Sequence, residues 1–297
     1  MPKNLHMSKK SSNFVPNLVC IMSELWKRTL SGVLYVAVIV LSIIFWEGFV
    51  WSLLAPVLAC LSVHEYNKLT HPRCLMDLYS ELAAFTMPFA VTLYATNQTV
   101  SVAVVYCVIL LFCILVELWD KKGNPIMNWG NLLVGQVMFA LPFALMNVLC
   151  YISNYLLLAV FILIWTNDTF AYCVGVTTAK MPGGNHKMSP RISPKKSWEG
   201  LIGGIVCTII AAFLLHRFGW FDTITKEGYE DLIVIAFALI VSLFGVLGDL
   251  IESLIKRTVG VKDSGKFLPG HGGILDRFDS VLLASPIALL FVLLMTC

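Results

Sequence analysis

Long apolar runs, separated by short polar stretches, dominate the amino-acid sequence from about residue 30 onward. A helix needs roughly 20 such residues to cross the hydrocarbon core of a bilayer, which is ~30 Å thick. The pattern predicts nine membrane-spanning helices, and eight or ten remain alternatives because some boundaries are weak. The predicted spans are residues 30–46, 49–66, 78–96, 100–118, 131–151, 155–178, 199–218, 231–256 and 273–296. We therefore predict an all-α, polytopic integral membrane protein.

The composition supports this prediction and excludes two other classes of protein. Hydrophobic residues make up 58% of the chain and charged residues only 13%, whereas soluble domains carry about 25% charged residues. The apolar runs are continuous and do not alternate with polar residues, which argues against a transmembrane β-barrel. The nine cysteines are scattered without zinc-ligand spacing, so we predict neither a disulfide framework nor a zinc site.

Lys and Arg residues predict how the chain is oriented in the membrane. Nine spans place five basic groups on one side, and cytoplasmic loops carry an excess of such residues. The groups are Lys27 and Arg28; Lys68 and Arg73; Lys121 and Lys122; the basic residues of loop 179–199; and those of loop 256–272. We therefore expect a cytoplasmic N-terminus and two cytoplasmic basic loops.

Charge also divides the chain into three expected parts. Residues 1–27 are polar and predict an N-terminal arm, and 28–130 predict a bland scaffold of about four transmembrane helices. Most charges inside apolar runs follow residue 165. We therefore expect residues 131–297, with about five helices and both basic loops, to form the catalytic part.

Carboxylates inside the predicted spans are the main functional signal. An ionised side chain at the centre of a bilayer costs about 2.5 kcal/mol or more, so it normally faces protein or a water-filled cavity. Those that break the apolar pattern are Asp168 in the sixth span, Asp249 and Glu252 in the eighth, and Asp276 and Asp279 in the ninth. Glu65 ends the second span, and we expect it to lie shallow enough to reach water.

The spacing of these acids predicts a cation site. Asp249 and Glu252 share one helical face, and Asp276 and Asp279 share another at similar depth. Facing carboxylates suit a hard divalent cation such as Mg²⁺. The alternative is that the acids pair with nearby Lys or Arg residues and only lock the helices together.

Two loops carry the features of a phosphate site. Gly270-His271-Gly272-Gly273 leads directly into the ninth span, where glycines and a helix N-terminus offer backbone N–H groups to anions. The basic residues of the same loop add charge for several phosphates. The second loop contains Lys195 and Lys196, which could instead be ordinary cytoplasmic charges, and Ser197, which could be a helix N-cap.

Two stretches carry a resemblance to a known family, the phosphatidate cytidylyltransferases, also called CDP-diacylglycerol synthases. The first stretch runs through Ser253, Lys256-Arg257, Lys262-Asp263, His271-Gly272-Gly273, Asp276-Arg277 and Asp279. The second runs through Asn167-Asp168, Ala171-Tyr172, Gly175 and Ser193 to Gly200. Phe170 departs from the small residue expected in this family. The resemblance covers residues 160–297, and only the pattern of spans extends it to the N-terminal half.

The resemblance implies a reaction, cofactors and partners. CTP and phosphatidic acid would yield CDP-diacylglycerol and pyrophosphate with Mg²⁺, and a monovalent cation such as K⁺ accompanies the divalent ion in some members. A homodimer in the bacterial inner membrane is expected, with its active site facing the cytoplasm and no nucleic-acid partner. A dedicated general base is not required, because phosphatidate is already an anion near neutral pH.

The same resemblance implies the site residues. The implied catalytic residues are Asp249, Asp276, Lys256, Arg257, Lys262, Asp263, His271 and Arg277. The implied substrate-binding residues are Asp168, Lys195, Lys196, Ser197, Ser253, Gly272 and Gly273. The implied metal ligands are Asp249, Asp276 and Asp279. The basic residues among these would hold phosphates, and His271 with its glycines would shape the floor of the pocket.

Two other functions remain open from the sequence. A transporter or channel could use Asp168, Asp249 and Glu252 as an ion or proton relay, although no internal repeat is visible. A CTP-dependent lipid-alcohol kinase could use the same groups and would transfer the γ-phosphoryl group instead.

Overall fold

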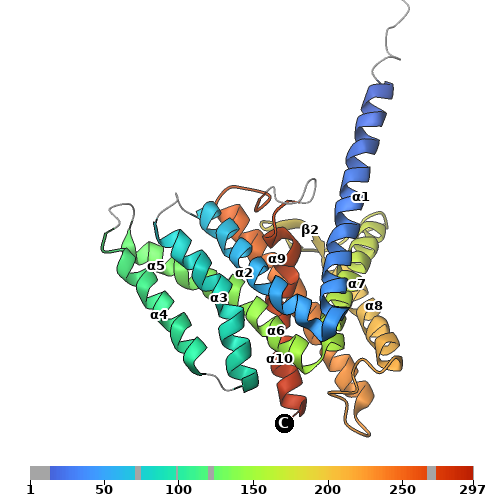
Figure 1. The fold of residues 1–297 in the computed structure, drawn as a ribbon. Coiled ribbons are helices and arrows are strands. Elements are labelled where there is room, and N and C mark those ends of the chain that lie inside the picture. The colour runs from blue at the N-terminus through green and yellow to red at the C-terminus, as the bar shows by residue number, and fades with distance from the viewer. Residues whose placement is uncertain (1–13, 71–74, 98–99, 120–123, 266–271, 297) are drawn as a thin grey trace, which may run out of the picture.

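The computed structural model describes residues 14–70, 75–97, 100–119, 124–265 and 272–296. Ten α-helices account for most of this part of the chain (Figure 1). They are α1 (Phe14–Ile44), α2 (Phe49–Thr70), α3 (Leu75–Asn97), α4 (Val100–Val116), α5 (Pro125–Val134), α6 (Leu141–Ile152), α7 (Asn154–Thr178), α8 (Trp198–Arg217), α9 (Glu230–Thr258) and α10 (Leu275–Thr296). A short 3₁₀ turn (Phe45–Gly48) joins α1 to α2, and a π-helical segment (Gly135–Ala140) joins α5 to α6.

The prediction of an all-α, polytopic membrane protein is confirmed. Helical structure covers every predicted span, and six helical segments of the described chain are long and apolar enough to cross a bilayer. One of these segments, residues 29–70, combines α1 and α2. The count of nine crossings and the cytoplasmic N-terminus stay predictions.

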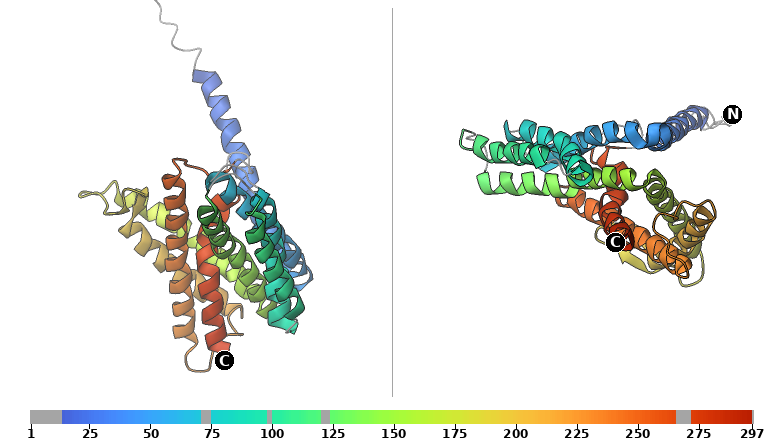
Figure 2. Two further views of the ribbon diagram at one scale, coloured as in Figure 1. Left: turned by 90° about the vertical axis from the view of Figure 1, so that its left-hand side faces the viewer. Right: turned by 60° about the horizontal axis from the view of Figure 1, so that its bottom comes forward.

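A sharp turn separates α1 from α2. Trp46 and Glu47 have positive φ angles of 49° and 52°, and Gly48 follows with a φ of 85°. A side chain at Gly48 would also collide with Cys150 of α6. The turn predicted at Glu47-Gly48 is therefore present. At its other end, α1 begins at Phe14, inside the segment that was expected to be a polar arm. This end of α1 extends beyond the remaining helices (Figures 1 and 2).

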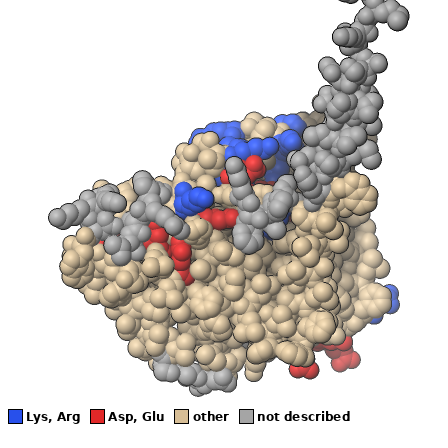
Figure 3. Space-filling model, turned by 45° about the horizontal axis from the view of Figure 1, so that its top comes forward, with Lys and Arg blue, Asp and Glu red and all other residues tan. Residues whose placement is uncertain are grey.

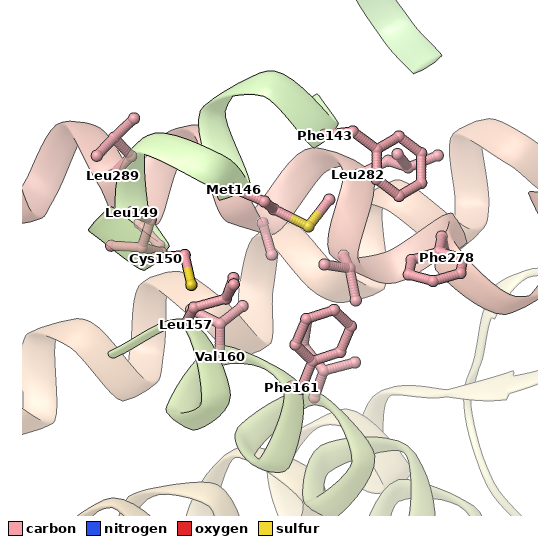
Figure 4. Packing of buried hydrophobic residues seen from close by; sticks show 14 of the residues in the cluster. Phe143, Met146, Leu149, Cys150, Leu157, Val160, Phe161, Phe278, Leu282 and Leu289 are labelled. Atoms are coloured by element: carbon pink, nitrogen blue, oxygen red, sulfur yellow. The ribbon is translucent and has the colours of Figure 1, made fainter. Parts of the chain in front are cut away.

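Aromatic side chains from three helices form the centre of the core. Phe143 of α6, Phe161 of α7 and Phe278 of α10 converge there (Figure 4). The rings of Phe143 and Phe278 meet edge to face, with their centroids 5.1 Å apart, a geometry that aromatic pairs favour. This packing places the first turns of α10 against the middle of the bundle.

Two close helix pairs, α7 with α8 and α9 with α10, form the C-terminal half. Glycines make both approaches possible. A Cβ atom at Gly204 of α8 would lie 2.7 Å from Asn167 Oδ1, and one at Gly248 of α9 would lie 2.5 Å from the carbonyl oxygen of Asp279. The glycine at position 248 therefore lets α9 and α10 bring their carboxylates together.

A β-hairpin occupies the first basic loop. Strands β1 (Lys187–Ser189) and β2 (Ser193–Ser197) pair antiparallel, and β2 leads directly into α8. Lys and Arg side chains gather at the end of the molecule that carries this hairpin (Figure 3). The predicted clustering of basic loops at one end of the bundle is therefore visible, although no membrane side is assigned by it.

Candidate active site

Three carboxylates from two helices form a compact cluster. Asp249 and Glu252 lie one turn apart on α9, and Asp279 lies on the first turns of α10. One oxygen of each lies within 4.8 Å of one oxygen of the other two. We call this group the carboxylate cluster. It contains two of the three predicted metal ligands together with Glu252.

The hydrogen bonding of the carboxylate cluster leaves acceptor capacity unused. Glu252 is only 4% exposed, and its Oε1 accepts no hydrogen bond within the described part of the chain. Asp249 accepts from Ser253 Oγ at 3.1 Å, and among the described residues Asp279 accepts only the adjacent N–H of Ser280, at 2.6 Å. Unused carboxylate acceptors favour a cation, and oxygen ligands at this spacing suit a hard divalent ion. The residues present therefore fit Mg²⁺.

A cavity of about 360 Å³ opens beside the carboxylate cluster, and we call it the polar cavity because four of its lining residues are charged. Its walls come from α7, the β-hairpin, the start of α8 and the middle of α9. Asp168, Lys195, Lys196, Ser197 and Asp249 line it. The structure thus brings four predicted substrate-binding residues to one predicted metal ligand.

Lys196 joins the β-hairpin to the carboxylate cluster. Its Nζ lies 2.8 Å from Asp249 Oδ2 and donates to the carbonyl oxygen of Val246 at 3.1 Å. Its neighbour Lys195 is exposed. Ser197 accepts from the N–H of Gly200 at 3.2 Å, which confirms the alternative that it caps α8.

An apolar cavity of about 250 Å³ reaches the same carboxylate cluster from another direction. It lies between α9, α10 and the π-helical segment. Glu252 and Asp279 are its acidic members, and the other lining residues are apolar side chains and a glycine. The carboxylate cluster therefore borders a polar cavity through Asp249 and an apolar one through Glu252 and Asp279.

Lys256 lies between the carboxylate cluster and Asp276. Its buried Nζ is 2.5 Å from Glu252 Oε2 and 2.7 Å from Asp276 Oδ1. The alternative that the acids pair with basic residues is therefore realised in part. It does not account for the whole group, because Asp279 has no basic partner among the ion pairs of the described residues.

Asp276 differs from the carboxylate cluster because protein donors surround it. Its Oδ2 accepts the N–H of Gly273 at 2.8 Å, the N–H of Ser264 at 2.9 Å and the hydroxyl of Ser264 at 3.0 Å. These bonds join the two stems of the second basic loop, which we define as residues 264–265 and 272–275. We call them the loop stems.

The prediction for Glu65 is wrong. Glu65 was expected to reach water, but it is only 8% exposed. Its Oε1 accepts from the N–H of Ile274, and its Oε2 accepts from the N–H of Leu275 and the hydroxyl of Ser264, each at 3.0 Å. A shallow carboxylate does not snorkel when a helix N-terminus offers unpaired donors nearby. These partners are 199–210 positions away in the sequence, so no local pattern could reveal them.

The same bonds change the expectation for the N-terminus of α10. The N–H groups of Gly273, Ile274 and Leu275, which were expected to face phosphate, are taken by Asp276 and Glu65. Protein carboxylates therefore occupy this anion site, and phosphates need the side-chain cations.

Comparison with known proteins assigns the chain to a family. A family model described as the cytidylyltransferase family matches residues 26–295. The chain belongs to the cytidylyltransferase family. A phosphatidate cytidylyltransferase of Staphylococcus aureus is 48% identical over 134 residues, which are 45% of this chain and 47% of the relative. One from Haemophilus influenzae is 42% identical over 136 residues, 46% of this chain and 45% of the relative. The matched part thus spans about half the length of these curated relatives.

Four other predicted residues that the structure describes, Arg257, Lys262, Asp263 and Arg277, line neither of the two cavities. Arg257 is exposed and donates to the carbonyl oxygens of Ile192 and Val261, and Lys262 and Asp263 are exposed. Arg277 lines a third cavity, of about 200 Å³, between α1, α2 and α10. His271 lies outside the described residues, and Gly272 adopts a φ of 85° at the start of the second stem.

Proposed function

We propose that this cytidylyltransferase joins CTP to phosphatidate, giving CDP-diacylglycerol and pyrophosphate. One observation carries the proposal: a single carboxylate cluster borders both a polar cavity and an apolar one. An enzyme that joins a water-soluble nucleotide to a lipid needs both environments at one reacting centre. The names of the curated relatives support the same substrates.

The proposed reaction is a nucleotidyl transfer. A phosphate oxygen of phosphatidate attacks the α-phosphorus of CTP, the bond from that phosphorus to the bridging oxygen of the β-phosphate breaks, and pyrophosphate leaves with the electron pair. Catalysis of this kind depends mainly on positioning and on neutralising charge. Lys196 and Lys256 supply positive charge beside the carboxylate cluster. No separate base is needed, since the attacking phosphate is an anion.

The proposed ligands of Mg²⁺ are Asp249 and Asp279, with Glu252 in the same cluster. The resemblance also implies Asp276 as a metal ligand; because its two oxygens accept from Lys256, Gly273 and Ser264, we propose that it holds Lys256 and the loop stems beside the carboxylate cluster. A bound Mg²⁺ would neutralise phosphate oxygens and orient the triphosphate. We propose K⁺ as a second cation, as the family resemblance implies.

The chain is an integral membrane protein, and we propose that the polar cavity opens to the cytoplasm of a bacterial inner membrane. The basic end of the bundle supports this orientation because cytoplasmic loops are rich in Lys and Arg (Figure 3). The curated relatives are bacterial. A homodimer is likewise proposed.

A product assay tests the proposed function. Purified protein in detergent receives Mg²⁺, K⁺, phosphatidic acid and CTP labelled in the α-phosphate. We expect label in the lipid fraction, release of pyrophosphate and loss of both signals with EDTA. Label that reaches lipid only from γ-labelled CTP would instead identify a lipid kinase. No transfer of either label by folded protein would contradict the proposal and favour an ion-flux assay.

A further inference from the structure

We infer that Glu65 is a positioning residue for the active site, holding the loop stems so that Asp276 and Lys256 keep their places beside the carboxylate cluster. The inference rests on the proposed function for its kinetic readout. Glu65 belongs to α2, in the segment expected to be a bland scaffold. It is thus a direct connection through which that scaffold would act on the chemistry.

The first step is the number and kind of bonds that Glu65 accepts. Both oxygens are used, and the three donors come from the two loop stems: Ser264 from the first, Ile274 and Leu275 from the second. Hydrogen bonds to a charged carboxylate are stronger than neutral ones. One side chain therefore connects both ends of the second basic loop to α2.

The second step is the close packing around that carboxylate. A Cβ atom at Gly265 would lie 2.6 Å from Glu65 Oε1, and one at Gly273 would collide with Glu65 and with Ser264 Oγ. Gly265 and Gly273 are therefore required by the approach of Glu65, in addition to any role with phosphate.

The third step is the path from Glu65 to the carboxylate cluster. The Ser264 hydroxyl lies 3.0 Å from both Glu65 Oε2 and Asp276 Oδ2, so its single hydrogen is shared between these two carboxylates. Asp276 Oδ1 then accepts from Lys256 Nζ, which also contacts Glu252. Buried polar networks of this kind hold their members in one arrangement when each link is satisfied. Loss of Glu65 should therefore release Asp276 and Lys256 from their present positions.

Glu65→Gln is the variant that tests this path. Glutamine keeps the volume of the side chain but replaces one carboxylate oxygen by an NH₂ group, which cannot accept a hydrogen bond. At least one of the three bonds from the loop stems is therefore lost. If Lys256 holds a phosphate of CTP, KM for CTP should rise about tenfold or more, while KM for phosphatidate stays within about twofold. Global destabilisation alone would lower the maximal rate by reducing active protein and would leave both KM values unchanged.

Ser264→Ala provides a second variant on the same path. It should raise KM for CTP in the same direction, and the double variant should be little worse than Glu65→Gln alone, because both changes break one network. Glu117→Gln is the matched control: Glu117 is also a buried scaffold carboxylate, 5% exposed, but its bond is to Asn128, far from the loop stems. Glu117→Gln should have the same KM values for CTP and phosphatidate as the unchanged protein.

The experiment measures both KM values, the maximal rate and the binding of CTP by calorimetry for all variants. Weaker CTP binding in Glu65→Gln, with normal binding in Glu117→Gln, supports the inference. If the unchanged protein binds CTP but makes no CDP-diacylglycerol, only the proposed function is overturned. Unchanged KM and binding in Glu65→Gln, or equal losses in Glu117→Gln, would overturn the inference.

Discussion

Two acidic centres lie side by side at the start of α10, and they are built in opposite ways. Asp276 and Glu65 are surrounded by N–H and O–H donors, which hold the loop stems in place. In the carboxylate cluster, Lys196 pairs with Asp249 and Lys256 with Glu252, but Glu252 Oε1 has no donor among the described residues and Asp279 has no basic partner there. The saturated centre is suited to fixing structure, and the unsaturated centre is suited to binding a cation.

The largest expected effect separates these two centres. Asp279→Asn should lower turnover about a hundredfold or more, because it removes a proposed cation ligand. The free energy of unfolding of this variant should change by less than about 1 kcal/mol. Among the described residues Asp279 accepts only one local hydrogen bond, and the substitution reduces like-charge repulsion. Initial rates over a range of Mg²⁺ concentrations and thermal unfolding in detergent measure both effects.

Asp276→Asn is the contrasting variant for this prediction. It weakens a buried ion pair with Lys256 and the bonds to the loop stems, so it should cost about 3 kcal/mol of stability as well as activity. Equal unfolding temperatures for Asp276→Asn and Asp279→Asn would remove the distinction between the two centres.

A smaller effect is expected where the polar cavity meets the carboxylate cluster. Lys196→Ala should lower kcat/KM for CTP about thirtyfold, because it removes the cation that pairs with Asp249 and leaves that carboxylate without its partner. Steady-state kinetics with varied CTP measures this loss.

The adjacent residue on β2 is the control for Lys196. Lys195 lines the same cavity but is exposed, and Lys195→Ala should change kcat/KM by about threefold or less. A larger loss at position 195 than at 196 would mean that triphosphate binds at the mouth of the cavity, away from the carboxylate cluster.

The smallest expected effect concerns the approach of α9 to α10. Gly248→Ala would place a Cβ atom 2.5 Å from the carbonyl oxygen of Asp279 and should force the helices apart. We expect a cost of about 1–3 kcal/mol in stability and about tenfold in activity, because the carboxylate cluster is distorted. Thermal unfolding and the product assay measure the two losses.

Gly245→Ala tests whether geometry or glycine itself matters. Gly245 lies one turn before Gly248 on α9. A Cβ atom at Gly245 would lie 3.6 Å from its nearest neighbour, Ile164, which is an ordinary contact. Alanine also favours helix over glycine by about 1 kcal/mol. Activity should stay normal, and a loss as large as that of Gly248→Ala would contradict the proposed role of close helix approach.

Most of the secondary structure could be predicted from the sequence because a bilayer imposes long apolar helices. The runs that predicted the last four spans match α7, α8, α9 and α10 closely. The spacing of Asp249 and Glu252 also predicted a shared face, which the carboxylate cluster confirms. These signals are local, since they depend only on residues one or two helical turns apart.

The sequence by itself therefore determined the class of protein, the helices and the residue types of the site. Only the tertiary structure decided how the carboxylates are divided between the two centres. Asp276 and Asp279 have the same helical spacing as a ligand pair, yet donors from the loop stems surround only Asp276. Glu65 belongs to the same centre as Asp276 because it accepts hydrogen bonds from residues about 200 positions away in the sequence. Hydrogen-bond donors, burial and close packing across helices are set by the assembled fold, and no local pattern specifies them.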